Sequence, residues 1–186
     1  MYDDNSLTPR EAIRLCALGT LAQQTTGQEI LYDDLVFAVR HFISRITGPS
    51  LDLMGESIEL LRYEGLIKIL DTENTSNPHI IITNDGRAVL KTLLLAKIRA
   101  GNSDLNKLIT ALKFRFLHLL PIDGQIEQAD HFLEICDTEI TRLNDLLSFH
   151  KNDKGNLTEW LKNDIEILNS RIAWLMTFRA SLDDKF

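Results

Sequence analysis

The chain has 186 residues, of which 44% are hydrophobic and 25% are charged, so it can bury a core and form one domain or a small domain with an extension. Its 20 basic and 27 acidic residues give a net charge of −7, which opposes unspecific attraction to nucleic acid but leaves room for a local basic face. Apolar stretches such as the one starting at Val89 are broken by lysine, and the N-terminus does not follow the pattern of a signal peptide. We therefore expect a cytoplasmic protein without membrane contact.

Two amphipathic helices are predicted first. Thr8 and Pro9 suit the N-cap and first turn of one helix, and its apolar side comprises Ile13, Ala17, Leu18 and Leu21. A brief β-prone stretch at 29–32 precedes the second helix, which Asp33 or Asp34 can cap. Its apolar stripe comprises Leu35, Val39, Phe42, Ile43 and Ile46.

The segment 50–67, SLDLMGESIELLRYEGLI, predicts a third helix that leads into a strand. Met54, Ile58 and Leu61 recur at intervals of four and three residues, so they face a core, and Gly65 closes the helix. Residues 66–70 continue as a short strand, 71–78 form a polar tip and 79–83 return as the partner strand, after which Thr83 can cap another helix. Three helices and a two-stranded wing result.

The third helix is acidic, although a helix in this arrangement often lies in the DNA major groove. Between residues 49 and 85 the chain carries seven acidic side chains and two basic ones, a net charge of −5. Asp52, Glu56 and Glu59 lie near the outward side of the helix, where they repel phosphates. We therefore expect weak unspecific affinity for DNA with a shallow salt dependence.

From residue 103 onward the pattern is wholly helical. Ser103 caps a helix that ends at Pro121. The next segment has a seam at alternating three- and four-residue steps, consisting of Ile126, Ala129, Leu133, Cys136, Ile140, Leu143 and Leu147. After a break at 152–156, the last segment has a second apolar seam, in which Arg179 is the one polar residue. This seam consists of Leu161, Ile165, Leu168, Ile172, Leu175 and Leu182. The two segments predict an antiparallel, coiled-coil-like helical hairpin.

The last helix carries a second apolar stripe, which one partner helix cannot cover. It consists of Trp160, Ile167 and Trp174 at seven-residue spacing, joined by Leu157 and Phe178. Either this helix lies centrally in its own monomer's core, or the second stripe packs against another subunit. We favour a homodimer that is formed through these five residues.

The stretch GPSLDLMGESIELLRYEGLI followed by HIIITNDGRAVL resembles the winged-helix pattern of PadR-type transcriptional regulators, particularly their AphA-like branch. The resemblance implies a mainly α fold with a small β wing, in which an N-terminal winged helix-turn-helix (1–100) precedes long C-terminal helices (101–186) that serve dimerisation. The sequence departs from the family where Gly55 replaces a usual tyrosine, and where Glu59 and Leu60 replace a basic pair. Family DNA contacts are therefore not carried over to this chain.

Four residues are our candidates for contacts to DNA. Arg40, His41 and Arg45 lie off the apolar stripe of the second helix, where a helix-turn-helix crosses the phosphate backbone. Ser50 offers its hydroxyl at the start of the third helix, whose free backbone N–H groups also suit a phosphate. For each residue the alternative is a solvated surface side chain. Arg10 and Arg14 can join the set if they face the same way.

Catalytic and metal-binding motifs are not found. The five histidines are dispersed without HExxH or linked CxxC spacing, and neither a glycine-rich phosphate loop nor a GxSxG turn occurs. Acidic residues such as Glu127, Asp130, Glu134 and Asp137 align beside the seam, where charges ordinarily face water. We expect no enzyme activity, no cofactor and no metal, and we expect Cys16 and Cys136 to be buried, reduced thiols.

Two functions from different classes remain open. The first is a dimeric transcriptional regulator whose two winged helices meet successive major grooves of double-stranded DNA about 34 Å apart on a two-fold symmetric site. The second is a protein-interaction module in which the same architecture has lost its affinity for DNA. A discrete basic strip around Arg40, Arg45 and Ser50 favours the first, and uninterrupted negative potential favours the second.

Overall fold

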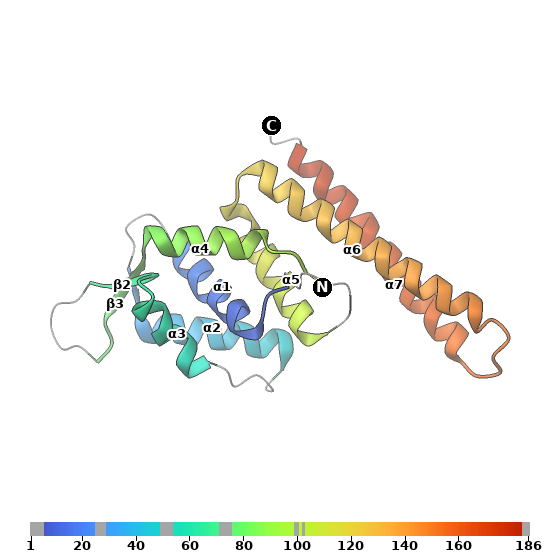
Figure 1. The fold of residues 1–186 in the computed structure, drawn as a ribbon, viewed down its shortest axis with the longest axis horizontal. Helices are drawn as coiled ribbons and strands as arrows, with labels where there is room; N and C mark the ends of the chain where they lie inside the picture. Colours follow the sequence, from blue (N-terminus) through green and yellow to red (C-terminus); the bar gives the residue numbers. More distant parts are fainter. Residues whose placement is uncertain are drawn as a thin grey trace, which may run out of the picture. The chain divides into compact units, whose positions relative to one another are not determined.

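The computed structural model describes residues 6–24, 29–48, 54–70, 76–98, 101 and 103–183, and for 54–57 only the backbone. The chain divides into two compact units, Met1–Ile98 with Asn102–Leu120 and Arg99–Gly101 with Pro121–Phe186. Figure 1 shows the helices and strands of both units in chain order. The fold is mainly helical with a small β-sheet, as the sequence predicts.

The first unit has a winged helix-turn-helix arrangement. Its elements are α1 (Pro9–Ala22), β1 (Ile30–Leu31), α2 (Tyr32–Thr47), α3 (Met54–Tyr63), β2 (Ile67–Ile69), β3 (His79–Ile82), α4 (Asn84–Leu95), α5 (Asp104–Phe116) and the 3-10 turn η1 (Leu117–Leu119). The sheet is antiparallel with the order β1-β3-β2, so β1 adds a third strand to the predicted two-stranded wing. In the register of this sheet, Ile30 faces Ile80 and Ile67 faces Ile82.

Three predicted helix caps are confirmed. The Thr8 side chain accepts from the backbone N–H of Glu11, whose carboxylate accepts in return from the Thr8 N–H, so α1 begins with a capping box. Thr83 caps α4 and Ser103 caps α5 in the same way, each accepting from the N–H three residues on. Each cap satisfies backbone donors that the first turn of a helix leaves without a partner.

The prediction that Asp33 or Asp34 caps α2 is wrong. The helix begins at Tyr32, and its N-cap, Leu31, makes no side-chain cap hydrogen bond. The base of the wing satisfies the first donors of α2 instead. The Tyr32 N–H donates to the Pro78 carbonyl at 2.9 Å, and the Asp33 N–H donates to Oδ1 of Asn77 at 2.9 Å.

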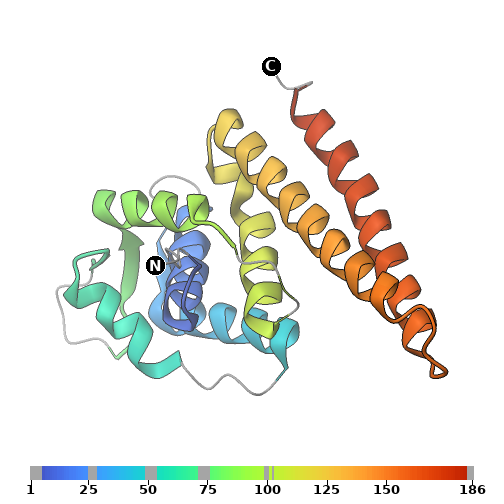
Figure 2. The same ribbon diagram turned by 45° about the vertical axis from the view of Figure 1, so that its right-hand side comes forward.

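α1 forms the centre of the first unit. It packs against α2, α3, α4 and α5, and Figure 2 shows it enclosed between α2, α4 and α5. The buried members of the predicted apolar stripes are Ile13, Ala17, Leu18, Leu21, Leu35, Val39, Ile43, Ile58 and Leu61. Phe42 and Ile46 are half-buried, and the side chain of Met54 lies outside the described residues. The helical periodicity therefore predicted the core of this unit.

The structure assigns α5 to the first unit, so the two units divide after Leu120 and not near residue 100. α5 packs against α1 and α2, and its buried side chains include Leu108, Leu112 and Phe116. Gly19 of α1 leaves space for the Phe116 ring, since a Cβ at Gly19 would lie 2.5 Å from a ring carbon. The α-helix ends at Phe116 and continues only as η1, so the predicted helical end at Pro121 is too late.

A buried lysine joins α5 to the end of α4. Lys113 is fully buried, and its ammonium donates to the carbonyl oxygens of Leu94 and Ala96. The carbonyl groups in the last turn of a helix have no partner within that helix, and they carry the negative end of its dipole. The Lys113 cation therefore stabilises the C-terminus of α4 and fixes α5 beside it.

The second unit is an antiparallel helical hairpin of α6 (Ile122–Phe149) and α7 (Leu157–Asp183), which pack along one another (Figure 1). The buried residues of α6 include Ala129, Cys136 and Leu143, which recur at seven-residue spacing. Those of α7 are Leu161, Leu175 and Leu182. All six belong to the predicted seam, which is thus the packed face of the hairpin.

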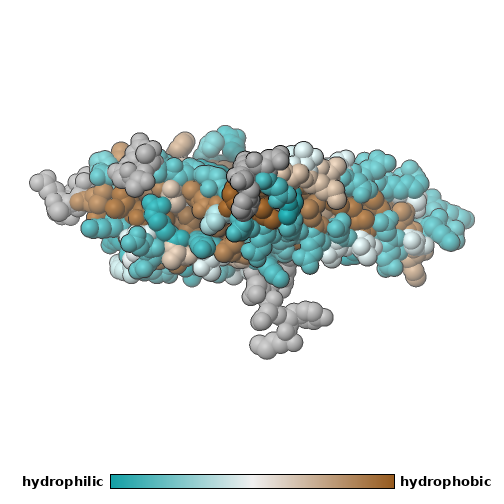
Figure 3. Space-filling model, turned by 90° about the horizontal axis from the view of Figure 1, so that it is seen from above, coloured by the Kyte–Doolittle hydropathy of each residue, from teal (hydrophilic) through white to brown (hydrophobic). Residues whose placement is uncertain are grey.

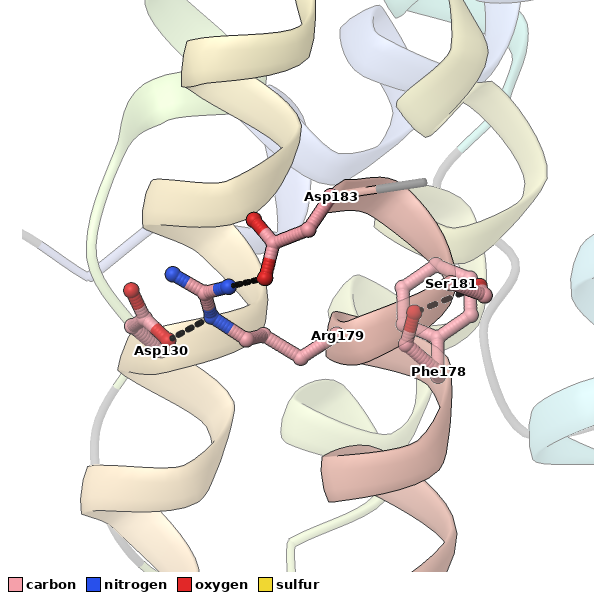
Figure 4. Close-up of polar contacts among 5 residues, drawn as sticks. All are labelled: Asp130, Phe178, Arg179, Ser181 and Asp183. Carbon is pink, nitrogen blue, oxygen red and sulfur yellow. Dashed lines mark hydrogen bonds and ion pairs between the residues drawn. The ribbon is translucent and has the colours of Figure 1, made fainter. Parts of the chain in front are cut away.

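Arg179, the polar exception in that seam, connects the two helices. Its Nε lies 3.0 Å from Oδ1 of Asp130 on α6, and its Nη1 pairs with Asp183 one turn further along α7 (Figure 4). Beside it, the Ser181 hydroxyl donates to the carbonyl oxygen of Phe178 at 2.6 Å. Because Asp130 and Arg179 must stay opposite one another, the ion pair favours one register of the hairpin.

Both cysteines are free and buried, as predicted. Burial raises the pKa of the Cys16 thiol to about 12, an effect that the nearby Arg115 and a hydrogen bond with Thr20 only partly offset. Burial also raises the pKa of Cys136. Thiolate reactivity is therefore suppressed at both positions.

Candidate nucleic-acid interface

The predicted phosphate-binding residues lie together on the outer face of α2. Arg40, His41 and Arg45 are exposed, and they lie opposite the buried Leu35, Val39 and Ile43. This distribution follows from the helical period, which places residues 40, 41 and 45 on one side and the apolar stripe on the other. Ser50, the fourth candidate, lies outside the described residues.

An exposed aromatic residue lies beside these cations. Phe37 is 70% exposed, and its ring stacks on the His41 ring with 5.9 Å between centroids. Together with Arg40, Ser44 and Arg45, these two residues form what we call the α2 strip. Phe37 was not among the predicted residues of this surface. In the sequence, Phe37 is distinguished only as a large apolar residue that lies two positions after Leu35 and outside the apolar stripe of α2.

One ion pair neutralises a carboxylate next to the C-terminal end of α3. Ile58 and Leu61 are buried, as predicted, whereas Glu59, Arg62 and Glu64 are exposed. Glu64 accepts from Arg14 of α1 at 2.7 Å, so Arg14 neutralises a carboxylate. The Arg62 guanidinium lies 5.5 Å from the centroid of the Tyr63 ring. Arg14 is therefore engaged in an ion pair, and Arg10 is exposed.

The surroundings of Tyr32, at the start of α2, raise its pKa. Burial raises the pKa of Tyr32 to about 12, helped by the Glu59 carboxylate and the negative charge of Asp33, while Arg62 acts in the opposite direction. Tyr32 thus remains a neutral hydrogen-bond donor at physiological pH.

The wing is anchored where α3 ends and α4 begins. The Thr83 hydroxyl donates to the Gly65 carbonyl at 2.8 Å and accepts from the Gly86 N–H at 3.0 Å, and the Thr83 N–H donates to the Leu66 carbonyl at 3.1 Å. Gly65 has φ of 72°, a left-handed conformation that favours glycine at a helix end. The sequence predicted both the cap and the helix end, but not the bond between them.

The second stripe of α7 is exposed within its own unit. Trp160, Ile167 and Trp174 are between 52% and 54% exposed, whereas Leu157 and Phe178 are half-buried. The Trp174 and Phe178 rings stack with their centroids 5.6 Å apart. Figure 3 shows apolar residues running along the hairpin between polar ones. α6 therefore covers the seam of α7 and leaves large apolar side chains exposed next to it.

Three more large apolar side chains are exposed among the described residues of the hairpin, beyond those of the predicted stripe. Met176 is 59% exposed, and Leu146 and Phe149 near the end of α6 are 38% and 83% exposed. The ring of Phe149 packs edge-on against His150, with 5.0 Å between centroids. None of the three belongs to a predicted stripe, so helical periodicity did not identify them.

The acidic flank of α6 faces outward. Glu127, Asp130, Glu134 and Asp137 are all exposed, and an open groove lies along this flank, lined partly by Leu133. Among the described residues, no group of histidine, cysteine and acidic side chains is arranged to hold a metal ion. The same part of the chain contains no helix that is long and apolar enough to cross a membrane.

A family model described as "Putative AphA-like transcriptional regulator" matches residues 2–179. No curated protein matches the chain. Among solved structures, Bacillus subtilis PadR in complex with operator DNA is similar at 16% identity, with 91% of this chain and 98% of that chain covered and a TM-score of 0.37. The smu.1604c protein of Streptococcus mutans UA159 is similar at 18% identity, with coverages of 96% and 98% and a TM-score of 0.36.

Proposed function

Because the chain belongs to the AphA-like family of transcriptional regulators, we propose that it is a homodimer that binds double-stranded DNA through its winged-helix unit. The observation that carries the proposal is the α2 strip. Arg40, His41 and Arg45 lie on one exposed face of a helix in a chain whose net charge is −7. Cations concentrated on one face attract phosphates locally even where the whole protein repels them.

In this arrangement α2 lies across the phosphate backbone and α3 enters the major groove. Arg40, His41 and Arg45 contact phosphates, and the hydroxyl of Ser50, which precedes α3 in the chain, contributes as well. Phosphate contacts position a protein on the duplex and carry no sequence information. Sequence is then read by the exposed side of α3, where Glu59 can accept from cytosine amino groups.

The exposed stripe of α7 supports the homodimer. Trp160, Ile167 and Trp174, with Leu157 and Phe178 at the edge, form an apolar surface that is costly to leave in water. A second copy of the chain can cover this surface with the same surface of its own, as in a two-fold symmetric contact. Two winged helices held in this way suit a site whose half-sites are about 34 Å apart.

Replacing Arg40 or Arg45 by alanine is expected to weaken binding to all DNA sequences alike, because each arginine contacts phosphate only. Each substitution should also reduce the slope of log affinity against log salt concentration by about 1. Fluorescence anisotropy titrations of labelled duplexes across a salt series measure both quantities. Lys162→Ala on α7 is the matched control, because it removes one cation from the other unit and should leave the titrations unchanged. If Arg40→Ala and Arg45→Ala behave like this control, the α2 strip does not contact DNA.

Glu59→Lys is expected to strengthen unspecific binding, by an amount that fades as the salt concentration rises. The change replaces an exposed negative charge on α3 with a positive one, and salt screens the resulting attraction. The same titrations with an unrelated duplex measure this effect. A steep salt slope in the wild type, or tight unspecific binding that Glu59→Lys leaves unchanged, would show that α3 does not face the DNA. No binding at low salt would favour the interaction module.

A further inference from the structure

The C-terminal end of α3 presents an exposed aromatic side chain beside an exposed cation. Tyr63 is 78% exposed, and Arg62 is the only basic residue in the sequence of α3. The Arg62 guanidinium lies 5.5 Å from the centroid of the Tyr63 ring. A guanidinium that stacks on an aromatic face can still donate from the N–H groups along its edge. The two side chains together therefore present an oriented cation at the end of the helix.

The helical period places Tyr63 one turn from Glu59. Ile58 and Leu61 are buried, so Glu59 and Tyr63, four residues apart, share the exposed side of α3. Four residues advance an α-helix by about 6 Å, which is about half the width of the major groove. When α3 crosses the groove with Glu59 over the base edges, its C-terminal end therefore reaches the phosphates along the edge of the groove.

The charges around this pair favour an anion at the same end of the helix. Glu64, the next residue after Tyr63, is paired with Arg14 of α1 at 2.7 Å, so its negative charge is neutralised. Glu59 adds a negative charge one turn back, and the sequence of α3 contains no second cation. Arg62 is therefore the only side chain of α3 that can offset the repulsion between this acidic helix and phosphates.

We propose that Arg62 binds a DNA phosphate at the edge of the major groove and that Tyr63 is a positioning residue, which holds the Arg62 guanidinium toward that phosphate. The site is separate from the α2 strip, because it lies on the helix that enters the groove. The inference rests on the proposed function, since it assigns a further contact within the same interface. A guanidinium binds two phosphate oxygens through two N–H groups, so a fixed orientation of its plane strengthens the contact.

Arg62→Ala removes the cation, and anisotropy titrations of labelled duplexes across a salt series measure the effect. The affinity at low salt should fall by about tenfold for all sequences alike, and the slope of log affinity against log salt concentration should fall by about 1. Lys91→Ala is the matched control, because Lys91 is an exposed cation of α4, which packs on the other side of α1 from α3 (Figure 2). The control should leave affinity and slope unchanged, and both variants should keep the circular dichroism of the wild type.

Tyr63→Ala separates the positioning role from the charge. Because it removes no charge, the salt slope should stay the same, while the affinity should fall by about threefold, as expected for the loss of an exposed cation–π contact. Tyr63→Phe keeps the ring face and should bind like the wild type. The double variant Arg62→Ala/Tyr63→Ala should bind no more weakly than Arg62→Ala alone, because Tyr63 acts through Arg62.

An Arg62→Ala variant that binds like Lys91→Ala would overturn the proposal. A loss from Tyr63→Ala that is equally large with and without Arg62, or that Tyr63→Phe shares, would also overturn it, because Tyr63 would then act independently of the cation. In each case, weaker binding by Arg40→Ala or Arg45→Ala would leave the proposed function in place. A wild type that binds no duplex at low salt would contradict both.

Discussion

Replacing Trp174 by glutamate is expected to turn a dimer into a folded monomer. Trp174 is 53% exposed in the isolated unit, stacks on Phe178 and lies one heptad from Ile167, at the C-terminal end of the exposed stripe. A tryptophan buried at the centre of an interface commonly contributes 2 kcal/mol or more to binding, about a thirtyfold change in affinity, and a buried carboxylate adds a desolvation cost. Light scattering gives the mass, and circular dichroism shows whether the helices remain.

The neighbouring residue provides a control for this experiment. Leu175 is 1% exposed and lies in the seam between α6 and α7, so Leu175→Glu should unfold the hairpin and lower the melting temperature. If Trp174→Glu lowers the melting temperature in the same way and without a change of mass, Trp174 belongs to the core of a monomer. A wild-type protein that is monomeric at concentrations of tens of micromolar would contradict the proposed homodimer.

Gly86→Ala is expected to be the most destabilising small substitution in the winged helix. An ideal Cβ at Gly86 would lie 2.2 Å from the carbonyl oxygen of Leu66 and 2.8 Å from Cγ1 of Ile82. That carbonyl oxygen accepts from the Thr83 N–H at 3.1 Å, so it cannot move away without breaking the bond that anchors α4 to the wing. Overpacking against backbone should cost about 3 kcal/mol of the free energy of unfolding.

Urea denaturation followed by circular dichroism measures the loss, and DNA binding should weaken in parallel as the first unit unfolds. Gly155→Ala is the matched control, because a Cβ there has no neighbour within 4 Å. The control should change the free energy of unfolding by less than about 0.5 kcal/mol. A Gly86→Ala variant as stable as the control would mean that α4 does not pack on Leu66 as described.

Features that depend on neighbouring residues could be predicted from the sequence. Thr8, Thr83 and Ser103 cap their helices within three residues, and the helical period placed Arg40 and Arg45 opposite the core. The seven-residue spacing of tryptophan and isoleucine on α7 likewise separated the exposed stripe from the seam. In each case one helix or one turn contains all the information that the prediction needs.

Features that depend on distant residues were missed. The cap of α2 comes from Asn77, which is 44 residues away from Asp33, and β1 is only two residues long and forms by pairing with β3. The ion pair between Arg14 and Glu64 joins distant parts of the chain in the same way. The packing of α5 against α1 and α2 also depends on distant residues, because an apolar stripe does not reveal which partner covers it.

We propose that two copies of this chain recognise a two-fold symmetric DNA site. The most direct test is an unbiased selection of DNA fragments by the purified protein at low salt, followed by sequencing of the retained fragments. We expect enrichment of an inverted repeat whose half-sites are about 34 Å, one helical turn, apart. Retention of no fragments, or of fragments without a shared sequence, would contradict the claim and favour a winged helix that contacts proteins.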